Sequence, residues 1–484
     1  MSPVATLPSR TPMDAGVDAT GILNLIDALE ADPAQEPHGL MILRRGAVIA
    51  QGWWAPYTAD RPQLVYSLSK SFTSAAAGVL VDEGVLDLDS TVVSHFPEFA
   101  DEITDERTRR MRVRHVASMA SGHENEMIDV ALRTDDVEPV RGFLLNPPEQ
   151  EPGSVFAYNQ PATYTLATIV HRLTGRTLVE FLRERVLDPI GAGPIAWEEW
   201  PEGRDIGYSG AFMTTDTIAR LGLLLLGRGQ WAGRRVLSQE WVDAATSVHV
   251  DTAPAPERGA SDWSRGYGFQ HWRSRHGYRG DGAFGQLCLV LPEHEAVVAY
   301  QGQSGDMQRL LDAVWQHLLP AIGRAGSAGA DAELAARLAG SSLPERVVAR
   351  VAVDADRWDG AAFSGAADGA ESGDSGDAGG HGARVRRDGD GWVLTLTGST
   401  GDVRARFTGE PGWCVTSGDG PVIAVSGGFA GDDELLLDVA FLETPHRLHL
   451  RFDRAAGVVT RRWQTPPLRD PADLRDLTAP GAFG

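Results

Sequence analysis

Ser67 and Lys70 are the residues whose types and spacing most directly suggest chemistry. The lysine follows the serine by three positions, and a run of small and apolar residues begins at Phe72. If Ser67 lies at the start of a helix, the two side chains share one face, a turn apart. A serine hydroxyl becomes a strong nucleophile when a nearby base removes its proton. A lysine can be that base if burial or a second cation lowers its pKa, and a lysine beside an Ala-rich helix is a candidate.

The Ser-x-x-Lys pattern is a weak signal by itself, because two fixed residues in four recur by chance. In the alternative interpretation, Ser67 is an N-cap and Lys70 is a solvated residue of the first helical turn. The helix dipole disfavours a lysine at this end, which favours the functional interpretation. Ser69 and Ser71 compete as nucleophiles, but neither has a lysine three positions later.

Residues 152–160 form a second notable stretch, in which a Pro-Gly turn leads into an aromatic segment containing Phe156 and Tyr158. A helix is predicted to follow, over residues 163–173. Tyr158 is therefore expected on a loop before a helix, where side chains can reach a cleft. Its hydroxyl could relay a proton to and from a serine or a leaving group. The alternative is an aromatic ring packed against Phe156.

A third stretch, residues 278–286, is rich in glycine and lies between predicted strands at 266–272 and 287–291. Glycine lets the backbone approach a ligand closely, so amides here could bind a developing oxyanion. The alternative is a glycine-rich hairpin or bulge without chemistry.

The elements that must position these residues can be predicted from pattern. Two strands around a tight Arg45-Gly46 turn are expected over residues 39–53, before the serine–lysine helix, which is expected to end near Gly84. Apolar periodicity predicts further helices over residues 112–119, 214–226 and 307–319, and another strand over residues 296–300.

The composition limits the classes of partner. The formal net charge of −22 opposes binding to nucleic acid or to an anionic membrane surface. No run of about 18 apolar residues appears, so no membrane insertion is expected. The first residues lack the basic start and apolar run of a secretory signal. Two distant cysteines give neither a disulfide framework nor a metal cluster. A cytoplasmic protein is the default expectation.

The length of 484 residues predicts one large domain and a smaller one. Residues 1–18 are expected to be a disordered lead, and residues 19–320 the main domain. A Gly/Ala-rich connector with a helical piece is expected at 321–340. Alternating apolar residues predict a small antiparallel β domain over 341–475, with a flexible acidic loop at 364–382.

Taken together, the three stretches resemble the serine β-lactamase and penicillin-recognising hydrolase superfamily, and in particular its class C-like branch of esterases, amidases and DD-peptidases. The resemblance covers roughly residues 20–320. It rests on Ser-x-x-Lys after an opening hairpin, Pro-Gly-x-x-Phe-x-Tyr before a helix, and a glycine-rich segment before Leu-Pro-Glu. It implies an α+β fold, in which helices flank an antiparallel sheet and an all-helical lobe lies between its strands.

The resemblance also implies roles for individual residues. Ser67 would be the nucleophile, Lys70 its base or base partner, and Tyr158 the tyrosine of the Tyr-x-Asn motif. The sequence departs from that motif, because Gln160 occupies the third position and the asparagine, Asn159, the middle one. Either amide could therefore contact the substrate.

The third motif of the superfamily, a Lys or His followed by any residue and Gly, is matched poorly. Gly280, Asp281 and Gly282 give the best placement, and they lack the cation. Ala283 would then supply an oxyanion-binding amide beside that of Ser67. Arg279 and His276 are close enough in sequence to replace the cation, although on a strand Arg279 points to the face opposite Gly280.

The expected function is acyl transfer from a small-molecule ester or amide to water through an acyl-enzyme on Ser67, without a metal or an organic cofactor. Asp281 would repel the carboxylate that β-lactams and D-Ala-D-Ala peptides carry, so an esterase is favoured over a β-lactamase or a DD-peptidase. The alternative function is that of a binding protein, which would have the same fold but no catalytic activity. The sequence gives no indication of oligomeric state.

Overall fold

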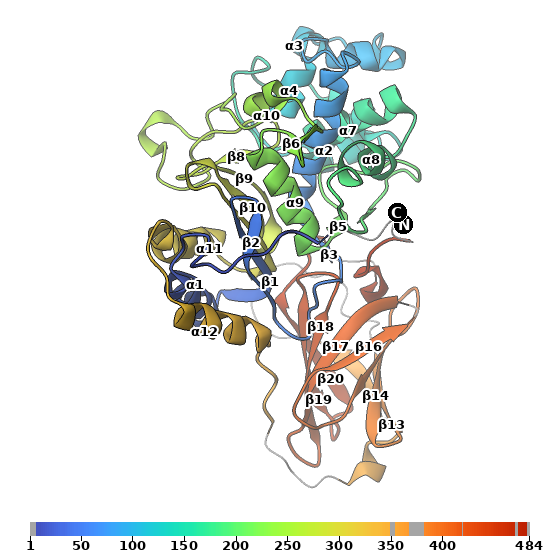
Figure 1. Cartoon of the computed structure of the whole chain (residues 1–484). Helices are drawn as coiled ribbons and strands as arrows, with labels where there is room; N and C mark the ends of the chain where they lie inside the picture. The colour runs from blue at the N-terminus through green and yellow to red at the C-terminus, as the bar shows by residue number, and fades with distance from the viewer. Residues whose placement is uncertain (1–5, 349–353, 367–381, 419, 470–472, 482–484) are drawn as a thin grey trace. The chain divides into compact units, whose positions relative to one another are not determined.

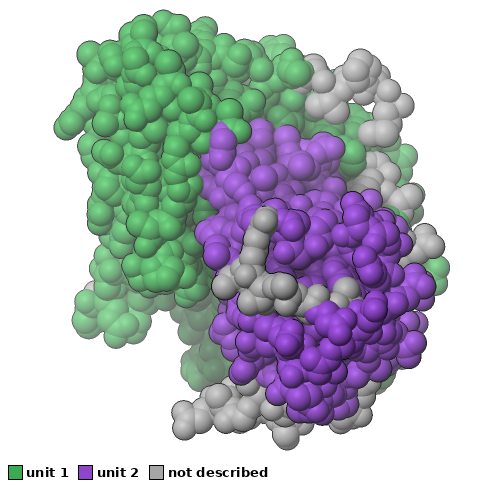
Figure 2. Space-filling view, turned by 90° about the horizontal axis from the view of Figure 1, so that it is seen from below, with its two compact units in different colours: residues 1–52, 65–339, 480–484 green, residues 53–64, 340–479 purple. Residues whose placement is uncertain are grey.

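The computed structural model describes residues 6–348, 354–366, 382–418, 420–469 and 473–481. The chain divides into two compact units, which Figure 2 shows in different colours. Unit 1 comprises residues 1–52, 65–339 and 480–484, and unit 2 comprises residues 53–64 and 340–479. The sequence did not indicate that the short segment 53–64 belongs with the C-terminal part of the chain.

Unit 1 is built on a six-stranded antiparallel sheet with the strand order β2-β1-β11-β10-β9-β8 (Figure 1). The turn between the first two strands has positive φ at both Arg45 (51°) and Gly46 (77°), which is typical of a two-residue hairpin and confirms the predicted turn. The strands are β1 (Gln35–Arg44), β2 (Ala47–Trp53), β8 (Trp272–Arg273), β9 (Tyr278–Gly282), β10 (Gln286–Leu291) and β11 (Ala296–Ser304).

Helices cover this sheet on both sides (Figure 1). One of them, α9 (Thr215–Leu226), packs so closely that a Cβ on Gly222 would lie 2.5 Å from the Val297 side chain of β11. The others are α1 (Ala19–Ala31), α11 (Met307–Ala313) and α12 (Ala328–Ala339). This arrangement is the predicted α+β architecture.

The helical lobe lies in the chain between β2 and β8. Its central helix, α2 (Ser69–Asp82), is buried along nearly its whole length, and a Cβ on Gly78 would lie 2.3 Å from Trp241. The surrounding helices are α3 (Glu106–Arg110), α4 (Val113–Ala117), α5 (Ile128–Thr134), α6 (Pro139–Leu144), α7 (Gln160–Thr174), α8 (Leu178–Leu182) and α10 (Gln239–Ala245). The lobe also contains short antiparallel pairs of β4 (Ala196–Trp197) with β5 (Ala211–Met213), and of β6 (Gln230–Trp231) with β7 (Arg234–Arg235).

Unit 2 has its own apolar core, which includes Trp358, Trp392, Phe407 and Phe452. Its nine-stranded sheet has the order β15-β14-β13-β12-β20-β19-β18-β17-β16 and is nearly closed, because β15 also contacts β16 and β17. The strands are β12 (Ala362–Ala366), β13 (Ala383–Asp388), β14 (Gly391–Leu396), β15 (Val403–Phe407), β16 (Cys414–Gly418), β17 (Gly420–Phe429), β18 (Glu434–Phe441), β19 (Arg447–Asp453) and β20 (Val458–Thr465). The short strand β3 (Gln63–Leu64) also belongs to this unit.

The predicted antiparallel character of unit 2 has one exception, because β12 pairs with β20 in parallel, with Ser364 opposite Val458. Of the loop expected at 364–382, residues 364–366 end β12 and residue 382 precedes β13. Residues 367–381 lie outside the described part of the chain.

One other expectation differs from the structure. Within the expected disordered lead 1–18, Ser9 pairs with Val48, and the Asp18 side chain caps α1 by accepting a hydrogen bond from the Thr20 amide. The helical piece expected within the connector 321–340 is the segment 328–339, whose Leu334 and Leu338 are buried. Apolar side chains four residues apart bury one helix face even in a Gly/Ala-rich segment. In the described parts of the chain, no helix combines the length and apolar character that a membrane span requires.

Candidate active site

Ser67 lies in a 3-10 turn, Tyr66–Leu68, directly before α2, rather than inside the helix. The residue before it, Tyr66, has a φ of 48°, a conformation that is uncommon for a bulky side chain. The Tyr66 ring packs edge-on against Phe284, with ring centroids 5.3 Å apart. The Ser69 hydroxyl donates to the Tyr66 carbonyl over 2.5 Å. These contacts hold a strained turn that presents a half-buried Ser67.

The competing serines, Ser69 and Ser71, form hydrogen bonds inside the protein. Besides donating to Tyr66, Ser69 Oγ accepts a hydrogen bond from the Ala211 amide at 3.1 Å. Ser71 Oγ donates to the Gln270 carbonyl at 3.2 Å. Both serines are buried. Ser67 is therefore the serine of the three that a substrate can reach.

Lys70 is buried, with 1% of its surface exposed, so it is not a solvated first-turn residue. Its Nζ lies 3.2 Å from Ser67 Oγ, 2.6 Å from Gln160 Oε1 and 2.6 Å from the Tyr208 carbonyl oxygen. Burial lowers the pKa of Lys70 to about 7, against the opposing effect of the Glu126 and Asp281 carboxylates. At neutral pH a large fraction of this lysine is a free amine.

The three partners of Lys70 suit a free amine that acts as a base. A neutral amine has two N–H bonds and one lone pair. The Gln160 side-chain oxygen and the Tyr208 carbonyl can only accept hydrogen bonds, so they take both N–H groups. The lone pair is then left for the remaining partner, the Ser67 hydroxyl.

Tyr158 completes this group from the loop before α7. Its hydroxyl forms a hydrogen bond with the Ser67 side chain. Its ring stacks on Trp272, with centroids 5.4 Å apart, and lies 4.7 Å from Lys70 Nζ. Burial, with the charge of Asp281 as a further cause, raises the pKa of Tyr158 well above its usual value. The tyrosine therefore stays protonated and can donate a hydrogen bond, while Lys70 is the stronger candidate for the base.

The two amides after Tyr158 have different environments. Asn159 is completely buried, and its Oδ1 accepts a hydrogen bond from the Met127 amide at 3.1 Å, so substrate contact by this residue stays a prediction. Its side chain turns inward because it ties down the loop before α5. Gln160, the first residue of α7, instead points to Lys70.

Strand β9 lies against the turn that carries Ser67. A Cβ on Gly282 would lie 2.1 Å from the Val65 carbonyl oxygen and 3.1 Å from the Ser67 amide nitrogen. A Cβ on Gly280 would lie 2.2 Å from Ser71 Oγ, so this glycine packs against α2, and its contact with a substrate stays a prediction. Both positions need glycine because of close approach. The role of the Ala283 amide in binding an oxyanion stays a prediction.

Asp281 and Arg279 form a buried ion pair, with 2.8 Å between Arg279 Nε and Asp281 Oδ2. Arg279 is completely buried and also donates to Ser274 Oγ at 2.7 Å. Burial raises the pKa of Asp281, and Arg279 and Lys70 oppose that rise. His276, the other suggested cation, packs edge-on against Trp315. The positive charge of Arg279 is thus paired with the Asp281 carboxylate.

Three residues beside the predicted group were not identified from the sequence, namely Glu126, Tyr208 and Trp272. Tyr208 lies between two glycines with positive φ, Gly207 (69°) and Gly210 (81°), and this glycine pattern was a usable sign of a tight loop. Glu126 follows no spacing rule that would connect it with Ser67. Its proximity results from the packing of the loop before α5 against α7.

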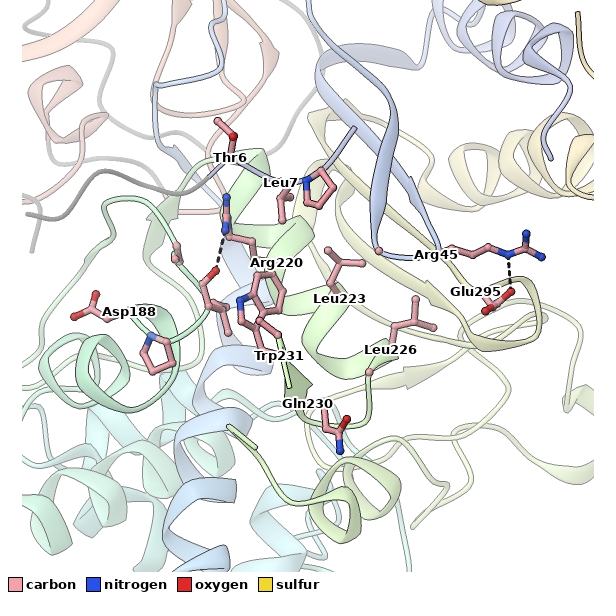
Figure 3. Close-up of a pocket in the computed structure, with 18 of the residues that line it drawn as sticks. Thr6, Leu7, Arg45, Asp188, Arg220, Leu223, Leu226, Gln230, Trp231 and Glu295 are labelled. Carbon is pink, nitrogen blue, oxygen red and sulfur yellow. Dashed lines mark hydrogen bonds and ion pairs between the residues drawn. The ribbon is translucent and has the colours of Figure 1, made fainter. Parts of the chain in front are cut away.

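A large pocket of unit 1, with a volume of about 1220 Å³, lies away from these residues (Figure 3). Its lining includes Leu223 and Leu226 of α9, with Trp231 beside them. Arg45 in its lining is paired with Glu295 at 2.9 Å. None of Ser67, Lys70 or Tyr158 lines this pocket. Within the described ranges, no group of three or more His, Cys, Asp or Glu side chains is arranged to hold a metal ion.

Comparison with known proteins finds hydrolases among the relatives of this chain. The chain is 27% identical over 307 residues to a 6-aminohexanoate-dimer hydrolase of Paenarthrobacter ureafaciens, a match that covers 57% of this chain and 78% of the relative. It is 27% identical over 158 residues to a lovastatin esterase of Penicillium rubens, which covers 28% of this chain and only 39% of that relative.

Among solved structures, a putative 6-aminohexanoate-dimer hydrolase from Bacillus anthracis has the same fold, with a TM-score of 0.51 and 20% identity. That likeness covers 66% of this chain and 87% of the solved one. Residues 26–318, which contain all the residues of the candidate site, match the Beta-lactamase family as a whole. The chain therefore belongs to the Beta-lactamase family.

Proposed function

We propose that this protein hydrolyses esters or amides of small molecules through an acyl-enzyme on Ser67. Membership of the Beta-lactamase family makes the chain a serine hydrolase of the esterase or amidase type. The residue roles and the substrate are the proposal. The observation that carries it is the position of Lys70 Nζ, 3.2 Å from Ser67 Oγ, on a buried lysine whose pKa burial lowers to about 7.

In the proposed reaction, Lys70 accepts the proton of the Ser67 hydroxyl as Oγ attacks the substrate carbonyl carbon. The carbonyl oxygen becomes an oxyanion, which the amides of Ser67 and Ala283 stabilise. Tyr158 donates its proton to the departing alcohol or amine, and Lys70 returns a proton to the tyrosine. Water then attacks the acyl-enzyme, its proton passes to Lys70, and the acid leaves as Ser67 recovers its hydrogen.

The charges around Ser67 support a preference for short, uncharged acyl groups. Arg279 is buried and already paired with Asp281, so its positive charge does not serve a substrate carboxylate. An unpaired buried charge is costly, so a carboxylate-bearing substrate loses binding energy here. The two relatives, a 6-aminohexanoate-dimer hydrolase and a lovastatin esterase, support ester or amide chemistry.

The test compares kcat/KM for p-nitrophenyl butyrate and for a chromogenic cephalosporin on one preparation. We expect the ester to be the better substrate, and Ser67→Ala to lose turnover by about 10⁴-fold or more. A cephalosporin preference would reject the esterase proposal and indicate a β-lactamase. Absence of Ser67 labelling by a fluorophosphonate, detected by mass spectrometry, would instead indicate a silent binding protein.

A cytoplasmic location remains part of the proposal. Both cysteines, Cys288 and Cys414, are free thiols, which is in line with a reducing compartment. Fractionation of the source cells with an antibody to the protein would test it. Recovery outside the cytoplasmic fraction would reject this location.

A further inference from the structure

We propose that Glu126 is a positioning residue, which fixes Gln160 against Lys70 and sets the charge balance around that lysine. The proposal rests on the proposed function, in which Lys70 is the base. Both carboxylate oxygens of Glu126 accept from the Gln160 amide at 3.1 Å. One of them also accepts from the Ile128 amide at 2.9 Å. The side chain of the same Gln160 receives the hydrogen bond from Lys70.

The first effect of Glu126 on Lys70 is mechanical and acts through the N-terminus of α7. Gln160 is the first residue of α7, a helix of 15 residues, and the N-cap residue Asn159 makes no side-chain capping bond. The Asn159 oxygen accepts from Met127 instead. Glu126 therefore takes the place of the missing cap and puts a negative charge at the positive end of the helix. By holding the α7 terminus, it holds the residue whose side chain orients the Lys70 amine.

The second effect of Glu126 on Lys70 is electrostatic. The groups that face Lys70 come from four segments: Glu126 before α5, Tyr158 before α7, Tyr208 before β5, and the Asp281–Arg279 pair on β9. Asp281 is neutralised in part by Arg279. Glu126 has no ion-pair contact with any described residue, so its charge acts on Lys70 through space and opposes the effect of burial. Burial raises the pKa of Glu126, and the amides of Ile128 and Gln160 and the charge of Lys70 oppose that rise.

Two substitutions separate the mechanical effect of Glu126 from its electrostatic effect. Glu126→Gln removes the charge but keeps an oxygen that can accept from the Gln160 amide, whereas Glu126→Ala removes both. Glu124 provides the matched control, since it is an exposed glutamate two positions away whose side chain accepts from Gln150 at 2.7 Å. The readouts are kcat/KM for p-nitrophenyl butyrate between pH 5 and 9, and the titration of Lys70 followed by NMR of ¹³C-labelled lysine, assigned with Lys70→Arg.

Because burial lowers the pKa of Lys70 to about 7, the wild-type protein should retain about a tenth of its plateau kcat/KM at pH 6. In Glu126→Gln this fraction should rise roughly two- to fivefold, because loss of the carboxylate favours the free amine. The NMR midpoint of Lys70 should move to lower pH in the same variant. Glu126→Ala should also lose plateau activity by roughly fivefold. Glu124→Gln and Glu124→Ala should change none of these values.

An unchanged Lys70 midpoint in Glu126→Gln, with only a lower Tm, would reduce Glu126 to a helix cap and overturn the proposal. A loss confined to ammonium-bearing esters would make Glu126 a substrate-binding group and also overturn it. The NMR readout decides the question even if the wild-type protein turns over no ester. In that case the proposed function fails, while the effect of Glu126 on Lys70 is still measured.

Discussion

The side-chain oxygen of Gln160 lies 2.6 Å from the amine of Lys70. Gln160 is the first residue of α7 and stands at the third position of the stretch that resembles the Tyr-x-Asn motif, where it is one methylene longer than asparagine. The neighbouring asparagine, Asn159, is buried and bonded to the Met127 amide instead. The departure from the motif changes the length of the amide side chain but leaves an amide oxygen on the lysine.

This relationship predicts different effects for the two amides. Gln160→Ala should lower kcat/KM roughly tenfold, because Lys70 loses one of the two acceptors that orient its lone pair. Asn159→Ala should leave the buried Met127 amide without its acceptor and cost about 1–3 kcal/mol of stability. The test is to measure the stability of both variants by thermal unfolding and their kcat/KM for an ester. Equal losses of stability in the two variants would contradict a separate role for Gln160.

Lys70 and Tyr158 are predicted to act as one proton-transfer unit. Each forms a hydrogen bond with the Ser67 hydroxyl, so removal of either one disables the same step. Lys70→Ala and Tyr158→Phe should each lower kcat/KM strongly, and the double variant should be little worse than the poorer single one. The measurement is steady-state kinetics of the wild type, the two single variants and the double variant. Fully additive losses would show that the two side chains work independently.

The activity should increase with pH through the titration of Lys70. Burial lowers the pKa of this lysine to about 7, and only the free amine can accept the Ser67 proton. Below pH 7, kcat/KM should therefore fall about tenfold for each unit of pH, and above it a plateau should follow. The raised pKa of Tyr158 keeps the phenol protonated along that plateau. A profile that is flat between pH 5 and 8 would exclude Lys70 as the titrating base.

Gly282→Ala should inactivate the protein because of geometry alone. The new Cβ would lie 2.1 Å from the Val65 carbonyl oxygen, a backbone atom that cannot rotate away, and would push β9 from the Ser67 turn. We expect a loss of ester turnover of at least about 100-fold, with a lowered Tm. Gly329→Ala is the control, since its Cβ would meet only Ser327 Oγ, at 3.9 Å, on a helix. Wild-type turnover in Gly282→Ala would show that this close approach does not matter for the site.

Much of the architecture could be predicted from local pattern. The hairpin turn at Arg45-Gly46 follows from backbone preference, and α2 follows from a run of apolar and small residues. The spacing of Ser67 and Lys70 placed them together because three residues make about one helical turn. Where composition misled, as in the expected disordered lead, the cause is a long-range contact, because Ser9 pairs with Val48.

The sequence by itself was enough to single out Ser67, Lys70 and Tyr158 as candidate site residues, since each belongs to a short local motif. Only the tertiary structure decided which amide meets Lys70, because Asn159 and Gln160 are adjacent and local pattern cannot tell which side chain faces inward. The same holds for the pairing of Arg279 with Asp281 and for Glu126, whose carboxylate reaches α7 from a loop 34 residues earlier in the chain. Such contacts depend on long-range packing, and no periodicity in the sequence encodes them.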